Sequence, residues 1–285
     1  MKLKKDLFCL YSNEKCDDSG IEALKLYLPT KDGYVNHNIV HSVLKSTNCD
    51  IWRLSTVYFC NNAFEPIRPL TRSGAEWEMA LKIDGRPDFI GGYAHGDEVF
   101  QNVKLTIDGE ECEITEISAP KSFNELIFEV WSVGYDPNDS ITEALLHYKK
   151  FIVNESGVKV EQSVEWLEDF ELGNSYMAMM PPLKCETDFY FDDNDTAIKE
   201  IPTIVSIAKT CNAKALYLLG NAGFKFGLCA VKYLSGENGE NTYLVSDNGG
   251  VPYNKLYFVL QHKGFVNEGD VWKTVTRYTI EANEG

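Results

Sequence analysis

The stretch HYKKFIVNESGVKVEQSVEW, residues 147–166, contains the pattern that decides the fold. Polar and apolar residues alternate on both sides of the turn-forming segment NESG at residues 154–157, which is typical of two strands joined in a hairpin. The period is two residues rather than 3.6, so the pattern favours strands over helices. Pairing Val153 with Val158 fixes the register of the whole hairpin.

This register brings three polar side chains to the inner face of the hairpin. His147 lies opposite Val164, and Lys149 lies opposite Gln162. The remaining inward residues are bulky and apolar: Phe151, Val160 and Trp166. Because a buried polar group without a partner is costly, we expect these residues to satisfy one another or to line a cleft. If residues 141–150 formed a helix instead, His147 and Lys149 would point apart and the cluster would not form.

Similar alternation recurs along the chain, for example in EWEMALKI at residues 76–83 and in VKLTID at residues 103–108. Turn signals such as IDGRPD and SDNGG separate these runs, and helical patterns are few. The sequence therefore predicts an all-β fold, a large antiparallel β-sandwich with few short helices. We expect a single domain over residues 1–285, in which residues 1–75 form an N-terminal strand extension.

Composition and charge restrict the partners. The 285 residues are 44% hydrophobic and 25% charged, which is ordinary for a globular protein, and the formal net charge is -16. Long-range repulsion opposes association with phosphate backbones and anionic lipids, so we expect neither nucleic acid nor membrane as a partner. A local basic pocket is compatible with this overall charge.

Cysteine spacing and targeting signals give a location. Eight scattered cysteines include no CxxC pair, which favours reduced thiols in a reducing compartment. The apolar run in MKLKKDLFCLYSNEKC is too short for a signal peptide, and no stretch approaches the roughly 20 apolar residues of a membrane-spanning helix. We expect a cytoplasmic protein as synthesised.

No metal or cofactor is expected. His37 and His41 have the four-residue spacing of metal ligands on a helix, but their neighbours favour a loop or strand. The acidic segment FDDNDT at residues 191–196 fits no established calcium loop, so a solvated loop is the simpler interpretation. The sequence also lacks the GxSxG, HExxH, phosphate-loop and dinucleotide motifs.

The segment DFIGGYAHGDEVF at residues 88–100 is the second candidate for a functional site. Two glycines precede Tyr93 and allow a sharp turn. If Gly96 adds no bulge, the parity of Val103 predicts further inward side chains on the following strand: His95, Asp97, Val99 and Gln101. The alternative for each histidine is a hydrogen-bonded core residue without catalytic function.

Inward histidine, lysine and glutamine side chains, together with nearby tyrosines, suit proton abstraction beside a carboxylate. A cation or an amide stabilises the charge that develops, and histidine or tyrosine moves the proton. We expect His95 to act as a base or a charge stabiliser in a cleft shared with His147 and Lys149. Asp97 would orient His95 or bind substrate hydroxyls.

Three segments resemble the β-sandwich domains of polysaccharide lyases and of their mutarotase-like relatives: LHYKKFIV, VEWLEDFELGNSYMAMMPP and LYFVLQHKGFVNEGDVWKTVTRYTIE. The resemblance spans roughly residues 76–282 and implies a jelly-roll or mutarotase-like sandwich that takes a saccharide ligand. For the lyase relatives it implies β-elimination on an acidic polysaccharide by a histidine and tyrosine site. The catalytic positions would be His95, His147 and Tyr176. The substrate-binding positions would be Arg86, Tyr93, Asp97, Lys149 and Gln162. The Arg-rich and Gln-x-His motifs of alginate-cleaving members are missing, which argues against alginate.

Two other interpretations compete with the lyase. EWEMALKIDGRPDFIGGYAHGDEVF also resembles segments of phage tail proteins, which implies a receptor-binding glycan pocket without turnover and a location in the virion. A sugar epimerase would use the same fold with a carboxylate base, such as Asp97 or Glu98, opposite a histidine.

Overall fold

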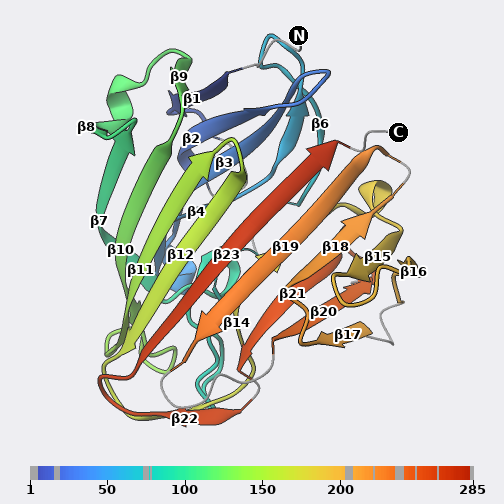
Figure 1. The fold of residues 1–285 in the computed structure, drawn as a ribbon. Helices are drawn as coiled ribbons and strands as arrows, with labels where there is room; N and C mark the ends of the chain where they lie inside the picture. The colour runs from blue at the N-terminus through green and yellow to red at the C-terminus, as the bar shows by residue number, and fades with distance from the viewer. Residues whose placement is uncertain are drawn as a thin grey trace.

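A computed structural model describes residues 6–15, 20–72, 77, 79–202, 208–220, 222–234, 241–247, 249–261 and 263–282. Strands dominate these residues, and they form two stacked layers (Figure 1). The described helices are single turns: α1 (Gly92–His95) and the 3-10 turns η1 (Lys45–Thr47), η2 (Ile114–Glu116) and η3 (Lys184–Glu186). The predicted all-β sandwich with few short helices is therefore confirmed.

The first layer is a broad antiparallel sheet, seen face-on in Figure 1. In order of hydrogen-bonded neighbours its strands are β16 (Lys199–Glu200), β15 (Phe189–Asp192), β18 (Ala215–Leu219), β19 (Phe224–Tyr233), β23 (Val271–Ala282), β12 (Gly157–Trp166), β11 (Glu143–Asn154), β10 (Leu126–Tyr135) and β7 (Glu98–Ile107). A short strand, β8 (Glu110–Cys112), turns back on β7.

The second layer has two parts. The N-terminal part contains β9 (Lys121–Phe123), β1 (Leu7–Ser12), β2 (Gly20–Pro29), β3 (Tyr34–Leu44), β4 (Cys49–Leu54), β5 (Tyr58–Cys60) and β6 (Pro66–Pro69). The other part contains β14 (Ser175–Met180), β21 (Asn254–Gln261), β20 (Thr242–Asp247) and β17 (Ala208–Cys211). A separate ribbon pairs β13 (Phe170–Leu172) with β22 (Gly264–Val266). The parallel pairing of β4 with β7 joins the N-terminal part to the first layer, so one large mixed sheet wraps around the core.

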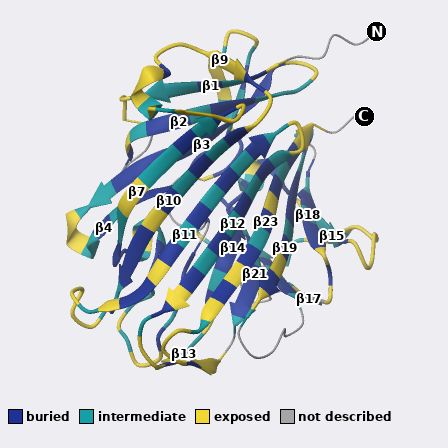
Figure 2. Cartoon of the chain, turned by 60° about the vertical axis from the view of Figure 1, so that its left-hand side comes forward, coloured by how far each residue is buried: buried dark blue, intermediate teal, exposed yellow. Residues whose placement is uncertain are grey.

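The core lies between the layers because each strand of the first layer turns alternate side chains inward. Phe128, Phe151 and Phe226 from that layer pack in one cluster with Leu24 and Ile39 from β2 and β3. Figure 2 shows the resulting bands of buried and more exposed residues along the strands. Burying an aromatic or aliphatic side chain of this size stabilises the fold by about 1.5–3 kcal/mol.

The predicted hairpin register is confirmed. Val153 pairs with Val158, and Lys149 pairs with Gln162, within β11 and β12. Residues 143–154 form a strand, so the alternative of a helix over residues 141–150 is wrong. The polar side chains of this hairpin consequently share its inner face.

The predicted parity before β7 is wrong because the strand contains a bulge. Asn102 pairs with Trp131 but Phe100 pairs with Ser132, so Gln101 is the extra residue. A bulge shifts the alternation by one position, and Glu98 points inward in place of Val99. Asp97, at the foot of the strand, is buried, but it precedes the first residue of β7.

His95 is also not on the strand that sequence parity predicted. It ends α1, after a turn in which Gly91 and Gly92 take positive φ values of 99° and 67°. Gly96, with φ of 81°, then reverses the chain against η1, where a Cβ atom would come 1.9 Å from the carbonyl oxygen of Thr47. Glycine is therefore required at this contact.

Two further expectations concern the cysteines and the membrane. Six cysteines of the described chain are free thiols: Cys9, Cys49, Cys60, Cys112, Cys185 and Cys229. The prediction that Cys16 and the side chain of Cys211 are also reduced lies outside the described residues. Within the described ranges, no helix combines the length and apolar character needed to cross a membrane.

Candidate functional site

The polar side chains of the hairpin surround the carboxylate of Glu98, which the sequence suggested only as a possible base of a sugar epimerase. Glu98 Oε1 lies 2.8 Å from Nδ1 of His147 and accepts a hydrogen bond of 2.6 Å from the Ser132 hydroxyl. The ammonium group of Lys149 lies 3.8 Å from the same oxygen. Three groups thus converge on one carboxylate oxygen.

The outer contacts of this cluster hold it rigidly. Lys149 donates to the carbonyl oxygen of Trp52 at 2.6 Å, which ties β11 to β4 in the opposite layer. Gln162 donates to the carbonyl oxygen of Met177 at 2.6 Å, so its Oε1 faces Nε2 of His147 at 3.2 Å. Both ring nitrogens of His147 therefore face side-chain oxygens.

Electrostatics and burial show what this cluster can do. Burial alone would raise the pKa of Glu98, but Lys149 and His147, with the hydrogen bonds from His147 and Ser132, hold it well below its ordinary value. The His147 and Glu98 side chains are 0% and 1% exposed. An ion pair in direct contact and closed to solvent has no room for a substrate, so the geometry supports a structural role.

A second histidine–carboxylate pair is open to solvent. His95 Nδ1 lies 2.7 Å from Oδ1 of Asp88, and the two side chains are 36% and 49% exposed. The Asp88 oxygen also accepts the backbone N–H of Phe89 at 2.8 Å, and the Phe89 ring lies against the imidazole with centroids 4.7 Å apart. The pair is thus both oriented and accessible.

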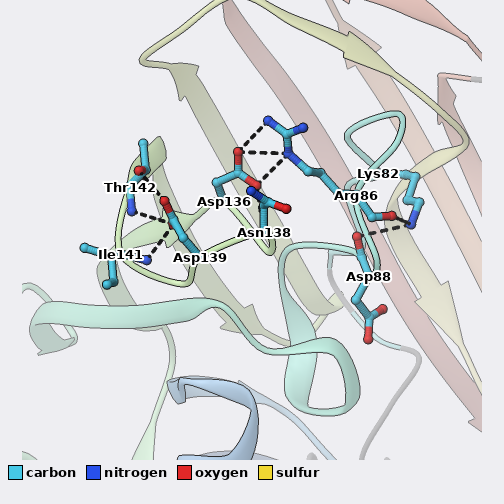
Figure 3. Close-up of polar contacts among 8 residues, drawn as sticks. All are labelled: Lys82, Arg86, Asp88, Asp136, Asn138, Asp139, Ile141 and Thr142. Atoms are coloured by element: carbon cyan, nitrogen blue, oxygen red, sulfur yellow. Dashed lines mark hydrogen bonds and ion pairs between the residues drawn. The ribbon is translucent and has the colours of Figure 1, made fainter.

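Figure 3 shows the loops that support this pair. Lys82 donates to the carbonyl oxygens of Arg86 and Asp88, at 2.6 and 3.3 Å, and so fixes the turn between them. Arg86 donates from Nε and one terminal nitrogen to both oxygens of Asp136 at 2.7–2.9 Å. The bidentate hydrogen bond to Asp136 raises the pKa of Arg86 above its ordinary value. The predicted substrate-binding guanidinium is therefore already paired.

Asp97 does not orient His95, contrary to the sequence-based expectation. Its backbone N–H donates to Thr47 at 2.7 Å, and its carbonyl oxygen accepts from Tyr135 at 2.8 Å. Burial raises the pKa of its carboxyl group, and contacts with Ser140 and Asn48 partly oppose that shift. Asp97 thus secures the loop that carries α1, while Asp88 orients the imidazole.

The two predicted tyrosines lie on different elements. Tyr93, in α1, places its ring 5.1 Å from the guanidinium carbon of the buried Arg53 on β4. Tyr176, on β14, packs edge-on against Tyr257 with ring centroids 5.1 Å apart. Tyr93 and His95 share one helical turn, whereas Tyr176 lies on a separate strand.

The structure therefore divides six of the eight predicted residues into two groups. His147, Lys149 and Gln162 form the closed cluster, whereas Arg86, Tyr93 and His95 belong to the loops around α1. Sequence reasoning missed Asp88 as the partner of His95, although the seven-residue separation and the two intervening glycines indicated a turn that could bring them together. No group of three or more His, Cys, Asp or Glu side chains is suitably arranged for a metal ion in the part of the chain described.

No protein-family model matches this sequence, and no curated protein sequence matches it. Solved structures do match the fold. The α-galactosidase AgaB of Geobacillus stearothermophilus, a GH36 protein, superposes with a TM-score of 0.52 and 8% identity over 90% of this chain. This chain shares that fold. An AgaA variant from the same organism, in complex with stachyose, gives the same score and identity, again over 90% of this chain.

The chain spans only 40% of AgaB and 41% of AgaA, so the likeness is to part of those enzymes. A galactose mutarotase-like protein from Lactobacillus casei matches with a TM-score of 0.46 and 8% identity, over 90% of this chain and 100% of that protein. None of the structures named here is a polysaccharide lyase or a phage protein. At this identity the comparisons show the fold alone.

Proposed function

We propose that this protein is a carbohydrate-active enzyme of the sugar epimerase class, in which His95, oriented by Asp88, transfers a proton. The carrying observation is the exposure of His95 and Asp88, 36% and 49%, against 0% and 1% for His147 and Glu98. The His41 side chain is 11% exposed, and both of its ring nitrogens lie against carboxylates, of Glu22 and Asp50. An acid–base group must reach the substrate before it can transfer a proton. The α-galactosidase fold and the stachyose-bound AgaA structure support a sugar as that substrate.

The proposed reaction interconverts the anomers of an aldose. Removal of the proton from the anomeric hydroxyl and protonation of the ring oxygen break the ring C–O bond and give the open-chain aldehyde. Rotation and reclosure, with the reverse proton transfers, give the other anomer. His95 carries out one of these transfers through Nε2, because Asp88 accepts from Nδ1 and fixes the ring, and solvent water at this exposed loop gives or takes the other proton.

The pairing of the cations favours an epimerase over a lyase that acts on an acidic polysaccharide. A lyase needs a positive group at the substrate carboxylate, but the Arg86 guanidinium already donates to both carboxylate oxygens of Asp136. Lys149 is closed to solvent and directed at Trp52 and Glu98. A neutral sugar requires no such cation, and hydroxyl groups can bind through the polar loops around α1.

The test follows mutarotation by polarimetry on freshly dissolved single anomers of a panel of neutral aldoses. We expect acceleration for at least one sugar, and a loss of about 10²- to 10⁴-fold in Asp88→Asn, because His95 then loses its charged partner. Asp195→Asn, at an exposed ion pair with Lys199, is the matched control and should retain the wild-type rate. Release of an ultraviolet-absorbing unsaturated product from an acidic polysaccharide, without mutarotation, would contradict the proposal and restore the lyase.

A further inference from the structure

A shallow hollow of about 280 Å³ lies on the outer face of the first layer, beside the β11–β12 hairpin. Its apolar part is made by Ile127 and Ile152, which are paired neighbours on β10 and β11. Three cations surround them from three strands: Lys150, Lys159 and Arg277. The same cross-strand row continues from Ile152 to Lys159 on β12 and on to Arg277 on β23.

The charge of this hollow is opposite to that of the whole protein. Three cations and one carboxylate, Glu125, line it, whereas the chain carries a formal net charge of -16. Lys159 also pairs with Glu161 at 2.8 Å, but both side chains are about one-third exposed, so this pair is weakly bound and exchangeable. A local excess of cations in a concave surface concentrates an anionic ligand there despite the overall charge.

Polar and aromatic groups extend the same surface. A neighbouring hollow of about 400 Å³ shares Glu125, Asn154 and Ser156 with the first one, but Asp6 and Glu155 also line it, so the cations belong to the first hollow alone. In the other direction Trp131, which is 36% exposed, lies against Tyr148 with ring centroids 5.2 Å apart. Trp131 is four residues along β10 from Ile127, or about 14 Å at strand spacing. An extended ligand could therefore contact both the cations and the aromatic pair.

We propose that this outer face binds a carboxylate-bearing oligosaccharide, with Lys150, Lys159 and Arg277 at the carboxylates and Trp131 against a sugar ring. Partly exposed aromatic rings favour the apolar faces of sugars, while amide and hydroxyl groups bind their hydroxyls. Asp136, beside the proposed acid–base site, follows β10 nine residues after Ile127, roughly 30 Å along the strand. The two sites are separate, and this inference stands without the proposed epimerase activity.

Isothermal titration calorimetry of the wild-type protein with trigalacturonate tests the proposal. The titration is run at about 0.05 M salt and again at 0.5 M salt, where the Debye length is about one-third as long. Saturable binding that weakens with salt is expected. Lys150→Gln with Lys159→Gln should lower the affinity about tenfold or more, because charge-assisted bonds are lost. Trp131→Ala should weaken binding separately, without changing its salt dependence.

The matched control replaces two exposed lysines outside the hollow, Lys45→Gln with Lys263→Gln, and changes the net charge by the same amount. Unchanged affinity in this control is expected. Equal weakening in both double variants, equal binding of neutral maltotriose, or no binding of trigalacturonate would each overturn the proposal. Full displacement by acetate at matched carboxylate concentration would also overturn it, because it would show a simple anion site.

Discussion

Replacing Glu98 with glutamine tests whether the closed cluster is structural. The substitution keeps the size and shape of the side chain but removes the charge 3.8 Å from the Lys149 ammonium group. At an effective dielectric constant of about 20, a charge pair at this distance is worth roughly 4 kcal/mol. Breaking a buried ion pair by neutralising one member typically costs about 3–5 kcal/mol. The amide oxygen of glutamine can still accept the hydrogen bonds from Ser132 and His147, so we expect a loss at the lower end of this range, about 3 kcal/mol.

Urea unfolding followed by tryptophan fluorescence measures the loss as a lower midpoint with an unchanged slope. Glu161→Gln, at the pair with Lys159 whose side chains are about one-third exposed, is the control and should cost less than about 1 kcal/mol. A loss below about 1 kcal/mol for Glu98→Gln would refute the reasoning, since the cluster would then contribute no more than a surface pair.

The pH dependence of the same variant has a definite sign. The folded protein lowers the pKa of Glu98 below its ordinary value of 4.5, so the carboxylate contributes stability above that pH. As the pH falls below 4.5 the unfolded chain takes up a proton first, and the advantage of the wild type over Glu98→Gln shrinks. An advantage that grows in acid would contradict this assignment.

Three further outcomes are expected. Burial lowers the pKa of His37 to about 4, so the free energy of unfolding should fall by up to about 1.4 kcal/mol per pH unit as the pH is lowered from 6.5 to 4. His37→Leu should remove this part of the acid sensitivity, and a pH profile of unfolding identical to that of the wild type would contradict the prediction. In the native protein Ellman's reagent should label the exposed Cys185 rapidly but reach Cys9, whose pKa burial raises to about 12, only on unfolding; rapid labelling of Cys9 would show that the first strand opens. Gly96→Ala should cost about 1–3 kcal/mol and reduce turnover, because its Cβ would collide with the Thr47 carbonyl oxygen at a φ of 81°; a stable, active variant would refute the packing of α1.

The hairpin could be predicted from sequence because local rules determine it. Alternation of period two and a four-residue turn fix the pairing of Val153 with Val158, and this register fixes which side chains share a face. The grouping of His147, Lys149 and Gln162 follows directly. The sequence could not show that this cluster is closed to solvent. One of the groups that enclose it is the carbonyl oxygen of Trp52, which lies 97 positions from Lys149 in sequence.

The second site shows where such reasoning stops. A single extra residue, Gln101, reverses which side chains point inward at the positions of β7 that precede it. Nothing in VFQNVKL distinguishes a bulge from a regular strand. Glu98 consequently replaced Asp97 as the partner of a histidine. The bond between His95 and Asp88 depends on three glycines with positive φ, whose direction of turn the sequence does not specify.

The most direct test of the account compares turnover per folded molecule and the free energy of unfolding in His95→Ala and His147→Ala, using an aldose whose mutarotation the wild type accelerates. We expect His95→Ala to lose about 10²- to 10⁴-fold in rate at nearly wild-type stability, because its side chain lies at an open loop. His147→Ala should lose several kcal/mol of stability and keep its rate per folded molecule, because it breaks a closed ion pair. A fully active His95→Ala, or a stable but inactive His147→Ala, would contradict the assignment of the chemistry to the open pair.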